Sequence, residues 1–346
     1  MNQQNPYSLT FGKEPRQLIS RFAQVDEVVN TFSDTTPTNQ VYMITGVRGS
    51  GKTVFMTSVV KTLQKNEEWI VVELNSSGEL LKELAAKLYQ VKGFSHIFRA
   101  DGINLSLWGI GLNIKKAEPL TDLQTAVERM LQKLAKSGKR LLITIDEVSN
   151  SKEMRYFAGA FQMMIRHDLP VFLLMTGLYE NINRLQNEEN LTFLYRAPKI
   201  YLTALNTYRM SDSYKKTLKL PEDKALALAR FTQGYPFAYQ VFGYFAYQNN
   251  GDYESVIPDI RQYLDEYVYD KIWSELSAKE TLILSAMATQ GLTKVSDLKE
   301  ALELKPNEFS VYRDRLIKKG ILNGETRGSL RFALPFFDDY TREHRA

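Results

Sequence analysis

The residues best suited to chemistry form a glycine-rich stretch in the first sixth of the chain. Gly46 is followed, after four residues, by Gly51, Lys52 and Thr53. Glycines let backbone N–H groups turn towards phosphate oxygens, a lysine there can reach the β- and γ-phosphates, and a threonine hydroxyl can bind Mg²⁺. The pattern therefore predicts a phosphate-binding loop, with a plain glycine turn as the alternative. The expected nucleotide contacts are Gly46, Arg48, Gly49, Ser50, Gly51, Lys52, Thr53 and Val54.

Two adjacent carboxylates form the second candidate site. Asp146 and Glu147 follow the apolar run 141–145, which reads as a buried strand. Downstream of a phosphate loop, Asp146 would hold Mg²⁺ together with Thr53, and Glu147 would act as the base for the attacking water. The pair favours hydrolysis of ATP with Mg²⁺ over a purely structural role for the two acids.

Two further side chains could face the terminal phosphate. Thr176 ends the apolar run 171–176 and could contact the γ-phosphate or the attacking water; a simple cap of the strand end is the alternative. Arg196 precedes an apolar, β-like run and could reach the phosphates of a neighbouring subunit. That role requires a homo-oligomer, and an ordinary surface arginine is equally compatible with the sequence.

The elements that must position these residues alternate between strand and helix. Strands are expected at 41–44, 69–74, 141–145 and 171–176, and helices at 20–32, from 53 onwards, at 80–91, 120–136 and 152–166. This alternation predicts an α/β fold with a parallel sheet and the ligand at the carboxyl ends of its strands. Residues 101–116 do not fit this alternation and predict an inserted β-hairpin or glycine-bent strand. The inserted segment would either fold back on the domain or contact a partner subunit or DNA.

The second half of the chain has a different character. Residues 206–250 read as helices with a break at 232–236, and another helix is expected from Val256 to Trp273. Between 274 and 343 three helical segments precede a strand, a turn and a strand, which is typical of a winged helix. The expected domains are an ATPase core at 1–204, a helical lid at 205–265 and a winged-helix domain at 266–346.

Positive charge is concentrated in this last domain. The chain carries 44 basic and 40 acidic residues, a net charge of +4. From Lys305 to Arg331 seven basic residues face three acidic ones, so this stretch alone accounts for the excess. This local concentration of positive charge favours duplex DNA as the partner, and a protein partner is the alternative. The expected phosphate contacts are Arg313, Lys318, Arg327 and Arg331.

Composition excludes several other classes of protein. Cysteine is absent, which excludes disulfides and thiolate metal sites, and the three histidines are scattered. No apolar run has the length of a membrane span, and the polar start does not resemble a signal peptide. These features lead us to expect a cytoplasmic protein with no membrane partner.

The segments GVRGSGKT, IDE and TGL, together with Arg196 and the helical segment after it, resemble an AAA+-type ATPase. The resemblance is closest to the origin-recognition/cell-division-cycle initiator ATPases and their bacterial, archaeal-type relatives. It implies a P-loop NTPase fold and places Arg21, which follows the lead-in NPYSLTFGKEPRQLIS, near the base and ribose.

One turn departs from the initiator pattern. The lid arginine of initiators is missing from Gly234-Tyr235-Pro236-Phe237. The Gly-x-Pro is similar to that of STAND signalling ATPases, in which the proline touches the adenine, a role that would fall to Pro236. The sequence thus predicts a slow ATPase switch that binds DNA, either initiator-like or as a mobile-element helper. The alternative is a STAND-type signalling or phage-defence ATPase whose winged helix contacts protein.

Overall fold

The computed structural model describes residues 4–10, 12, 14–100, 103, 105–110 and 122–344. The chain divides into two compact units. The first, which we call the lid unit, contains the described residues of Met1–Arg21, Gly46–Val54 and Tyr201–Ala346; the second, the sheet unit, contains those of Phe22–Thr45 and Phe55–Ile200. The division into three domains at 204 and 265 stays a prediction.

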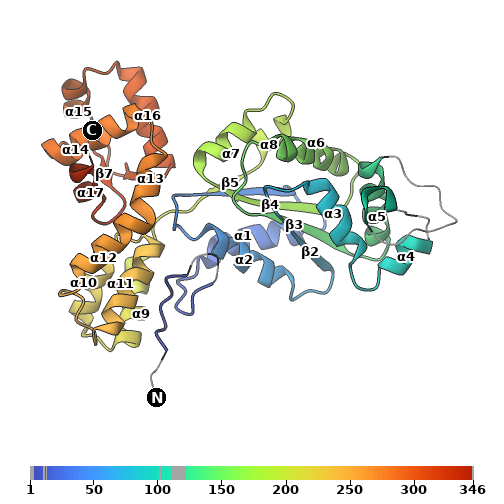
Figure 1. Cartoon of the computed structure of the whole chain (residues 1–346), viewed down its shortest axis with the longest axis horizontal. Coiled ribbons are helices and arrows are strands. Elements are labelled where there is room, and N and C mark those ends of the chain that lie inside the picture. Colours follow the sequence, from blue (N-terminus) through green and yellow to red (C-terminus); the bar gives the residue numbers. More distant parts are fainter. Residues whose placement is uncertain are drawn as a thin grey trace. The chain divides into compact units, whose positions relative to one another are not determined.

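A five-stranded sheet forms the centre of the sheet unit (Figure 1). Its strand order is β2-β3-β4-β1-β5, and the pairs β2–β3, β3–β4 and β4–β1 are parallel. The predicted α/β fold with a parallel sheet is thereby confirmed. The strands are β1 (Val41–Thr45), β2 (Trp69–Leu74), β3 (Arg140–Ile145), β4 (Val171–Gly177) and β5 (Lys199–Tyr201).

Helices cover both faces of this sheet. Alternate strand residues such as Met43, Ile143 and Leu173 share one core with α3 (Leu80–Tyr89), α5 (Leu123–Lys136) and α6 (Lys152–Arg166). On the other face α1 (Phe22–Ser33) packs its Phe32 ring against Tyr42 and Phe172, with centroids 5.5 and 5.1 Å apart. Both faces of each central strand are therefore buried, which explains why the strands read as continuous apolar runs. Shorter helices are α4 (Ser95–Ala100), α7 (Tyr179–Gln186) and α8 (Thr192–Arg196).

The segment expected to form a β-hairpin or bent strand is different where it is described. Ser106–Trp108 forms a short 3₁₀ helix that ends at Gly109 with φ +74°. The strand prediction is therefore wrong for these residues: the leucines that alternate with polar residues belong to a tight turn, whose Leu105 is buried in the core of the sheet unit. The rest of that prediction, residues 101, 102, 104 and 111–116, lies outside the described residues.

The lid unit contains helices α9 (Thr207–Leu218), α10 (Glu222–Phe231) and α11 (Pro236–Gln248). The N-terminal segment packs into their core through Tyr7, whose ring lies 5.8 Å from that of Tyr214 and 5.7 Å from that of Tyr239. Gly243 makes this possible, because a Cβ at this position would come within 2.4 Å of the Tyr7 ring. The aromatic-rich stretch 236–248 is thus mainly packed core.

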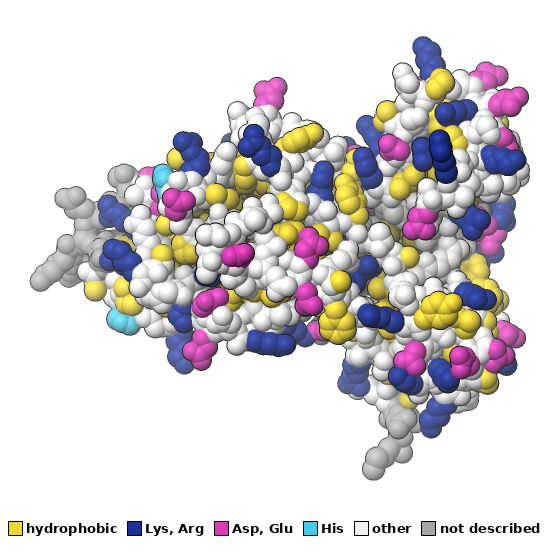
Figure 2. Space-filling view, turned by 180° about the vertical axis from the view of Figure 1, so that it is seen from behind, with side chains coloured by type: hydrophobic (Ala, Val, Ile, Leu, Met, Phe, Trp, Pro, Cys, Tyr) yellow, Lys and Arg dark blue, Asp and Glu magenta, His cyan; other side chains and the backbone are white. Residues whose placement is uncertain are grey.

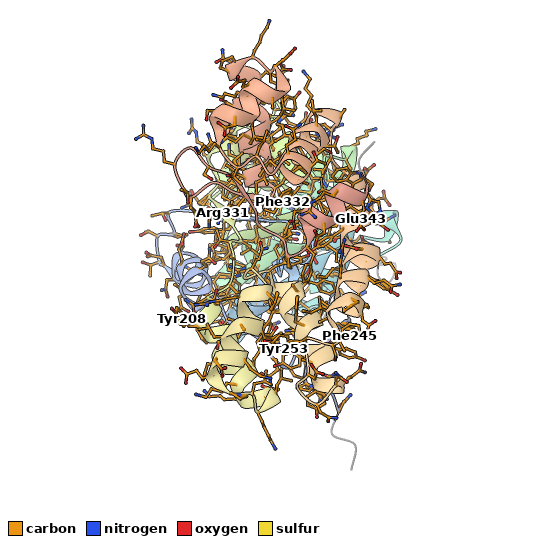
Figure 3. The ribbon with its side chains drawn as sticks, turned by 90° about the vertical axis from the view of Figure 1, so that its left-hand side faces the viewer. Tyr208, Phe245, Tyr253, Arg331, Phe332 and Glu343 are labelled. Carbon is orange, nitrogen blue, oxygen red and sulfur yellow. The ribbon has the colours of Figure 1, made fainter. Side chains whose placement is uncertain are left out.

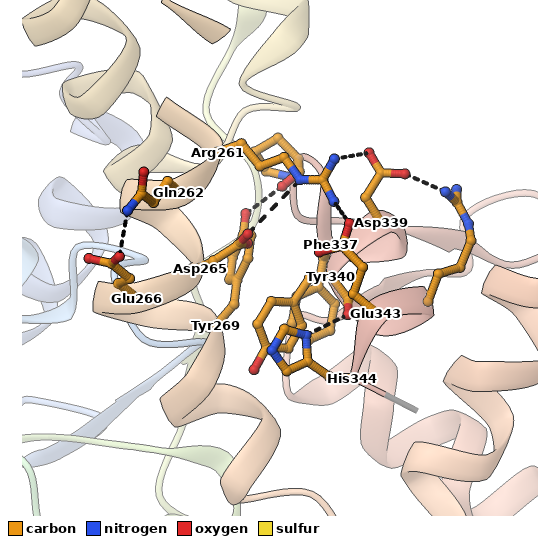
Figure 4. Close-up of polar contacts among 12 residues, drawn as sticks. Arg261, Gln262, Asp265, Glu266, Tyr269, Phe337, Asp339, Tyr340, Glu343 and His344 are labelled. Carbon is orange, nitrogen blue, oxygen red and sulfur yellow. Dashed lines mark hydrogen bonds and ion pairs between the residues drawn. The ribbon is translucent and has the colours of Figure 1, made fainter. Parts of the chain in front are cut away.

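A helical connection leads to the C-terminal part of the lid unit. It consists of α12 (Ile257–Leu264), a π-helical turn at Asp265–Tyr269 and α13 (Asp270–Ser274). Arg261 lies among the carboxylates of Asp265, Asp339 and Glu343, with its shortest contact, 2.5 Å, to Glu343 (Figure 4). These ion pairs join the connection to α17 (Phe337–Glu343), a helix that the sequence pattern did not predict.

The C-terminal elements come in the expected order. Three helices, α14 (Ala278–Gln290), α15 (Val295–Leu302) and α16 (Pro306–Lys318), precede the antiparallel strands β6 (Leu322–Asn323) and β7 (Arg331–Phe332). Ser277 and Glu280 form a capping box at the start of α14. The Glu280 carboxylate, 1% exposed, also pairs with Lys319 at 2.7 Å, which ties α14 to the end of α16.

Candidate nucleotide site and basic surface

The glycine-rich loop starts directly after β1, and α2 (Lys52–Leu63) begins within it. Gly49 and Gly51 have φ values of +72° and +87°, which only glycine adopts at low cost. A Cβ at Gly51 would meet no atom within 4 Å, so there is open room beside the loop. The N-terminus of a 12-residue helix adds its positive dipole end. These features suit a bound phosphate group.

Lys52 lies within the loop. Its side chain is 9% exposed, and its Nζ donates hydrogen bonds to the backbone oxygens of Gly46 and Val47, each at 3.0 Å. Ser50 is buried, and its Oγ has no hydrogen-bond partner among the described residues. A buried ammonium beside a buried hydroxyl without a partner fits a polyanion, which would accept hydrogen bonds from both.

Arg48, a predicted nucleotide contact, pairs with a residue far along the chain. Its Nε and Nη2 donate to the Glu275 carboxylate, at 3.1 and 2.6 Å to Oε1. The Arg48 carbonyl oxygen accepts a 2.6 Å hydrogen bond from the hydroxyl of Tyr235, which is buried. Sequence reasoning missed Glu275, since a contact across 227 residues leaves no local pattern.

The predicted acids and the predicted sensor meet in the sheet unit. In the sheet register Ile145 lies opposite Met175, so Asp146 and Thr176 follow at the same edge. The Thr176 hydroxyl donates to the Asp146 carboxylate, and the Glu147 N–H donates to Asp146 Oδ1 at 3.1 Å and to Thr176 Oγ1 at 3.2 Å.

Glu147 is exposed and has a φ of +53°. This left-handed conformation is rare for residues other than glycine and is concentrated at functional sites. One network therefore fixes Asp146, while the Glu147 side chain stays accessible to solvent. Among the described residues no three His, Asp or Glu side chains cluster as metal ligands. A Mg²⁺ ion held by one or two protein oxygens together with phosphates and water fits this donor set.

The other predicted nucleotide contacts lie in varied settings. Arg21 donates a 2.5 Å hydrogen bond to the Thr203 oxygen; desolvation lowers its pKa to about 10, so it stays charged at neutral pH. Pro236 is the first residue of α11 and follows Gly234, which has a φ of +77°. A Cβ added to Gly234 would lie 2.7 Å from the Cβ of Ala204. Arg196 is exposed at the end of α8, and Val54 is half-buried in α2.

The predicted DNA contacts lie on α16, in the β6–β7 turn and in β7. Lys318, Arg327 and Arg331 are exposed and Arg313 is half-buried. Arg331 is labelled beside Phe332 in Figure 3, and Figure 2 shows lysines and arginines spread over this part of the lid unit. Lys319, which contributed to the charge count, is only 12% exposed in its pair with Glu280.

A phosphate loop after β1, an Asp-Glu pair after β3 and a threonine at the end of the intervening β4 define an AAA+-type P-loop ATPase that resembles the initiator ATPases. The sequence model of an ATPase domain predominantly from Archaea matches residues 21–193, half of the chain. The chain belongs to this ATPase family. Residues 266–341 match a second model, described as a domain of unknown function (DUF8462). No curated protein matches the sequence.

Solved structures support the fold over nearly the whole chain. A Walker-type ATPase of Pyrococcus abyssi superposes with a TM-score of 0.62 at 17% identity, over 94% of this chain and 96% of that one. The ORC2 protein of Aeropyrum pernix, in its ADPNP–ADP complexes, gives 0.60 at 14% identity over 96% and 95%. Among the described residues no helix has the length and apolar character of a membrane span.

Proposed function

We propose that the protein is a nucleotide-controlled switch that binds Mg-ATP, hydrolyses it slowly to ADP and phosphate, and binds duplex DNA through a C-terminal winged helix. The observation that carries the hydrolytic part is the network of Asp146, Glu147 and Thr176 at one edge of the sheet. Nucleotide binding is supported further by the solved ORC2 structure with ADPNP and ADP.

Each residue of the site has a role in this proposal. Lys52 and the backbone N–H groups of the loop bind the phosphates, and Thr53 and Asp146 hold Mg²⁺. When bound, the metal ion supplies neutralisation of the phosphate charge. Glu147 accepts the proton of the attacking water, and Thr176 keeps Asp146 oriented while it senses the phosphate. Arg196 contributes from a neighbouring copy if the active form is a homo-oligomer.

Two substitutions test the hydrolytic part. Glu147→Gln removes the base but not the loop, so ATP binding is expected to stay and turnover to fall by about 100-fold. Lys52→Ala is expected to abolish nucleotide binding. Unchanged turnover in the first variant removes Glu147 from its role, and unchanged affinity in the second contradicts the phosphate loop.

The DNA-binding part is supported by the shape and charge of the C-terminal elements. Helix α16 has 13 residues, and Arg313 and Lys318 lie on it, while Arg327 lies in the β6–β7 turn and Arg331 in β7. A helix with a basic turn beside it suits the major groove and the flanking phosphates.

Salt dependence of duplex binding by the full chain tests this part. Arg331→Gln is expected to reduce the slope of log K against log[salt] by about 1. Lys136→Gln, an exposed lysine on α5 of the sheet unit, is the matched control and should leave the slope unchanged. Equal slopes for wild type and Arg331→Gln remove Arg331 from the interface.

A second candidate function is a signalling or defence switch whose C-terminal domain contacts protein. The ion pair of Arg48 with Glu275 favours it, because it links the phosphate loop to the C-terminal elements without any nucleic acid. Intact ATP binding combined with no salt-dependent binding of duplex DNA is the result expected from this alternative.

A further inference from the structure

The phosphate loop is held at three points by residues more than 180 positions away in the sequence. Tyr235 donates its hydroxyl hydrogen to the Arg48 carbonyl oxygen, and Glu275 binds the Arg48 guanidinium. Val47, 9% exposed, belongs to the buried core of the lid unit, where a Cβ on Gly320 would lie 3.5 Å from its own Cβ. The loop is therefore a packed part of the lid unit.

Gly49 shows how tightly the loop and the turn before α11 fit together. A Cβ on Gly49 would lie 2.3 Å from the Tyr235 hydroxyl and 2.8 Å from the Phe237 Cβ. The glycine thus leaves the space in which the tyrosine reaches the Arg48 carbonyl. With the backbone fixed in this way, the Arg48 side chain extends to Glu275, which lies one residue beyond α13.

The pairing of Arg48 with Glu275 bears directly on anion binding. Three donor–acceptor contacts of 2.6 to 3.3 Å join the guanidinium to the carboxylate, and both side chains are about one third exposed (33% and 32%). The Lys271 Nζ also lies 3.7 Å from this carboxylate. While Glu275 is bound, the loop arginine is neutralised and cannot make its strongest bonds to a phosphate.

We propose that Glu275 is a positioning residue that holds Arg48 in the nucleotide-free loop, and that a bound nucleoside triphosphate competes with Glu275 for this guanidinium. The inference rests on the proposed nucleotide binding. By linkage, the two effects are equal in size. Glu275 lowers nucleotide affinity by the same free energy by which bound nucleotide weakens the contact of Glu275 with the loop. ATP binding in this way loosens the C-terminal elements from the phosphate loop.

The competition predicts that removing the charge of Glu275 tightens nucleotide binding, whereas a merely structural role of Glu275 does not. Glu275→Gln keeps the size of the side chain but removes its charge, so the full chain should bind mant-ATP with Mg²⁺ about threefold to fivefold more tightly, as expected for a partly exposed ion pair. Raised salt should shrink this difference. A structural role instead predicts weaker binding, because the loop would lose a contact.

A double-mutant cycle shows whether the effect runs through Arg48. In an Arg48→Gln background, Glu275→Gln is expected to change mant-ATP affinity by less than about twofold. Lys271→Gln is the matched control on the same carboxylate: it removes the competing partner of Glu275 and should not tighten binding.

The outcomes separate the two proposals. Failure of wild-type protein to bind mant-ATP, or equal binding by Lys52→Ala, overturns the proposed function and this inference with it. Normal behaviour of those two proteins, with no tightening in Glu275→Gln or with the same tightening in the Arg48→Gln background, overturns only the competition between Glu275 and nucleotide.

Discussion

Two buried threonines at neighbouring strand ends test what the network around Asp146 contributes. Thr176 ends the core of β4 and Thr45 ends β1, and both have a side-chain exposure of 0%. The Thr176 hydroxyl donates to Asp146 and accepts the Glu147 N–H, whereas the Thr45 hydroxyl has no hydrogen-bond partner within the described part of the chain. Valine replaces the hydroxyl by a methyl group of similar size at both positions.

The two substitutions should have different effects on the free energy of unfolding. Thr176→Val removes a hydrogen bond to a charged carboxylate, so the free energy of unfolding is expected to fall by about 1.5–3 kcal/mol. Thr45→Val removes a buried hydroxyl without a partner, so this free energy should stay constant or rise by about 1 kcal/mol. For a domain of this size each kcal/mol shifts the melting temperature by about 2–4 °C.

Urea unfolding without nucleotide, followed by tryptophan fluorescence, measures this difference. Trp69 of β2 reports on the sheet, since its ring lies 5.0 Å from that of Phe172. In the same Thr176→Val protein, ATP turnover is expected to fall at least about tenfold with mant-ATP affinity nearly unchanged, because Asp146 loses its orientation. Equal midpoints for the two valine variants, or full turnover in Thr176→Val, refute the reasoning.

Two further predictions concern the lid unit. Gly49→Ala places a methyl group against the Tyr235 hydroxyl at φ +72°, so the free energy of unfolding in urea should fall by about 2–5 kcal/mol. The matched control is Gly159→Ala in α6, where a Cβ meets nothing within 4 Å, and it should not lower this free energy. Desolvation raises the pKa of Asp265 to about 6. Between about pH 4 and pH 6 the folded protein therefore keeps a proton on Asp265 that the unfolded chain has lost, so the free energy of unfolding falls as the pH rises through this range. Asp265→Asn should therefore lose part of the wild-type fall in melting temperature between pH 4.5 and 7; an identical pH profile in both proteins contradicts this assignment.

Much of the fold followed from local patterns. The bounds of α6 and β2 coincide with the predicted ranges, since a helix or strand buried on a known face repeats its apolar residues with a fixed period. The short 3₁₀ helix at Ser106–Trp108 was missed because alternating leucines in six residues fit a strand and a turn equally well. Helix α17 was missed because it has only seven residues, mostly polar or aromatic.

The sequence by itself determined the chemistry at the phosphate loop and at the Asp-Glu pair. Gly46, Lys52 and Thr53 at their spacing predict backbone donors, a cation and a metal ligand, because such predicted roles follow from residue type and local spacing alone. The tertiary structure decided which side chains act together. Because β4 lies between β1 and β3, Thr176 reaches Asp146, and because the lid unit folds around the loop, Glu275 binds Arg48. These partners meet through strand order and packing across many tens of residues, and neither leaves a period or spacing that the chain alone displays.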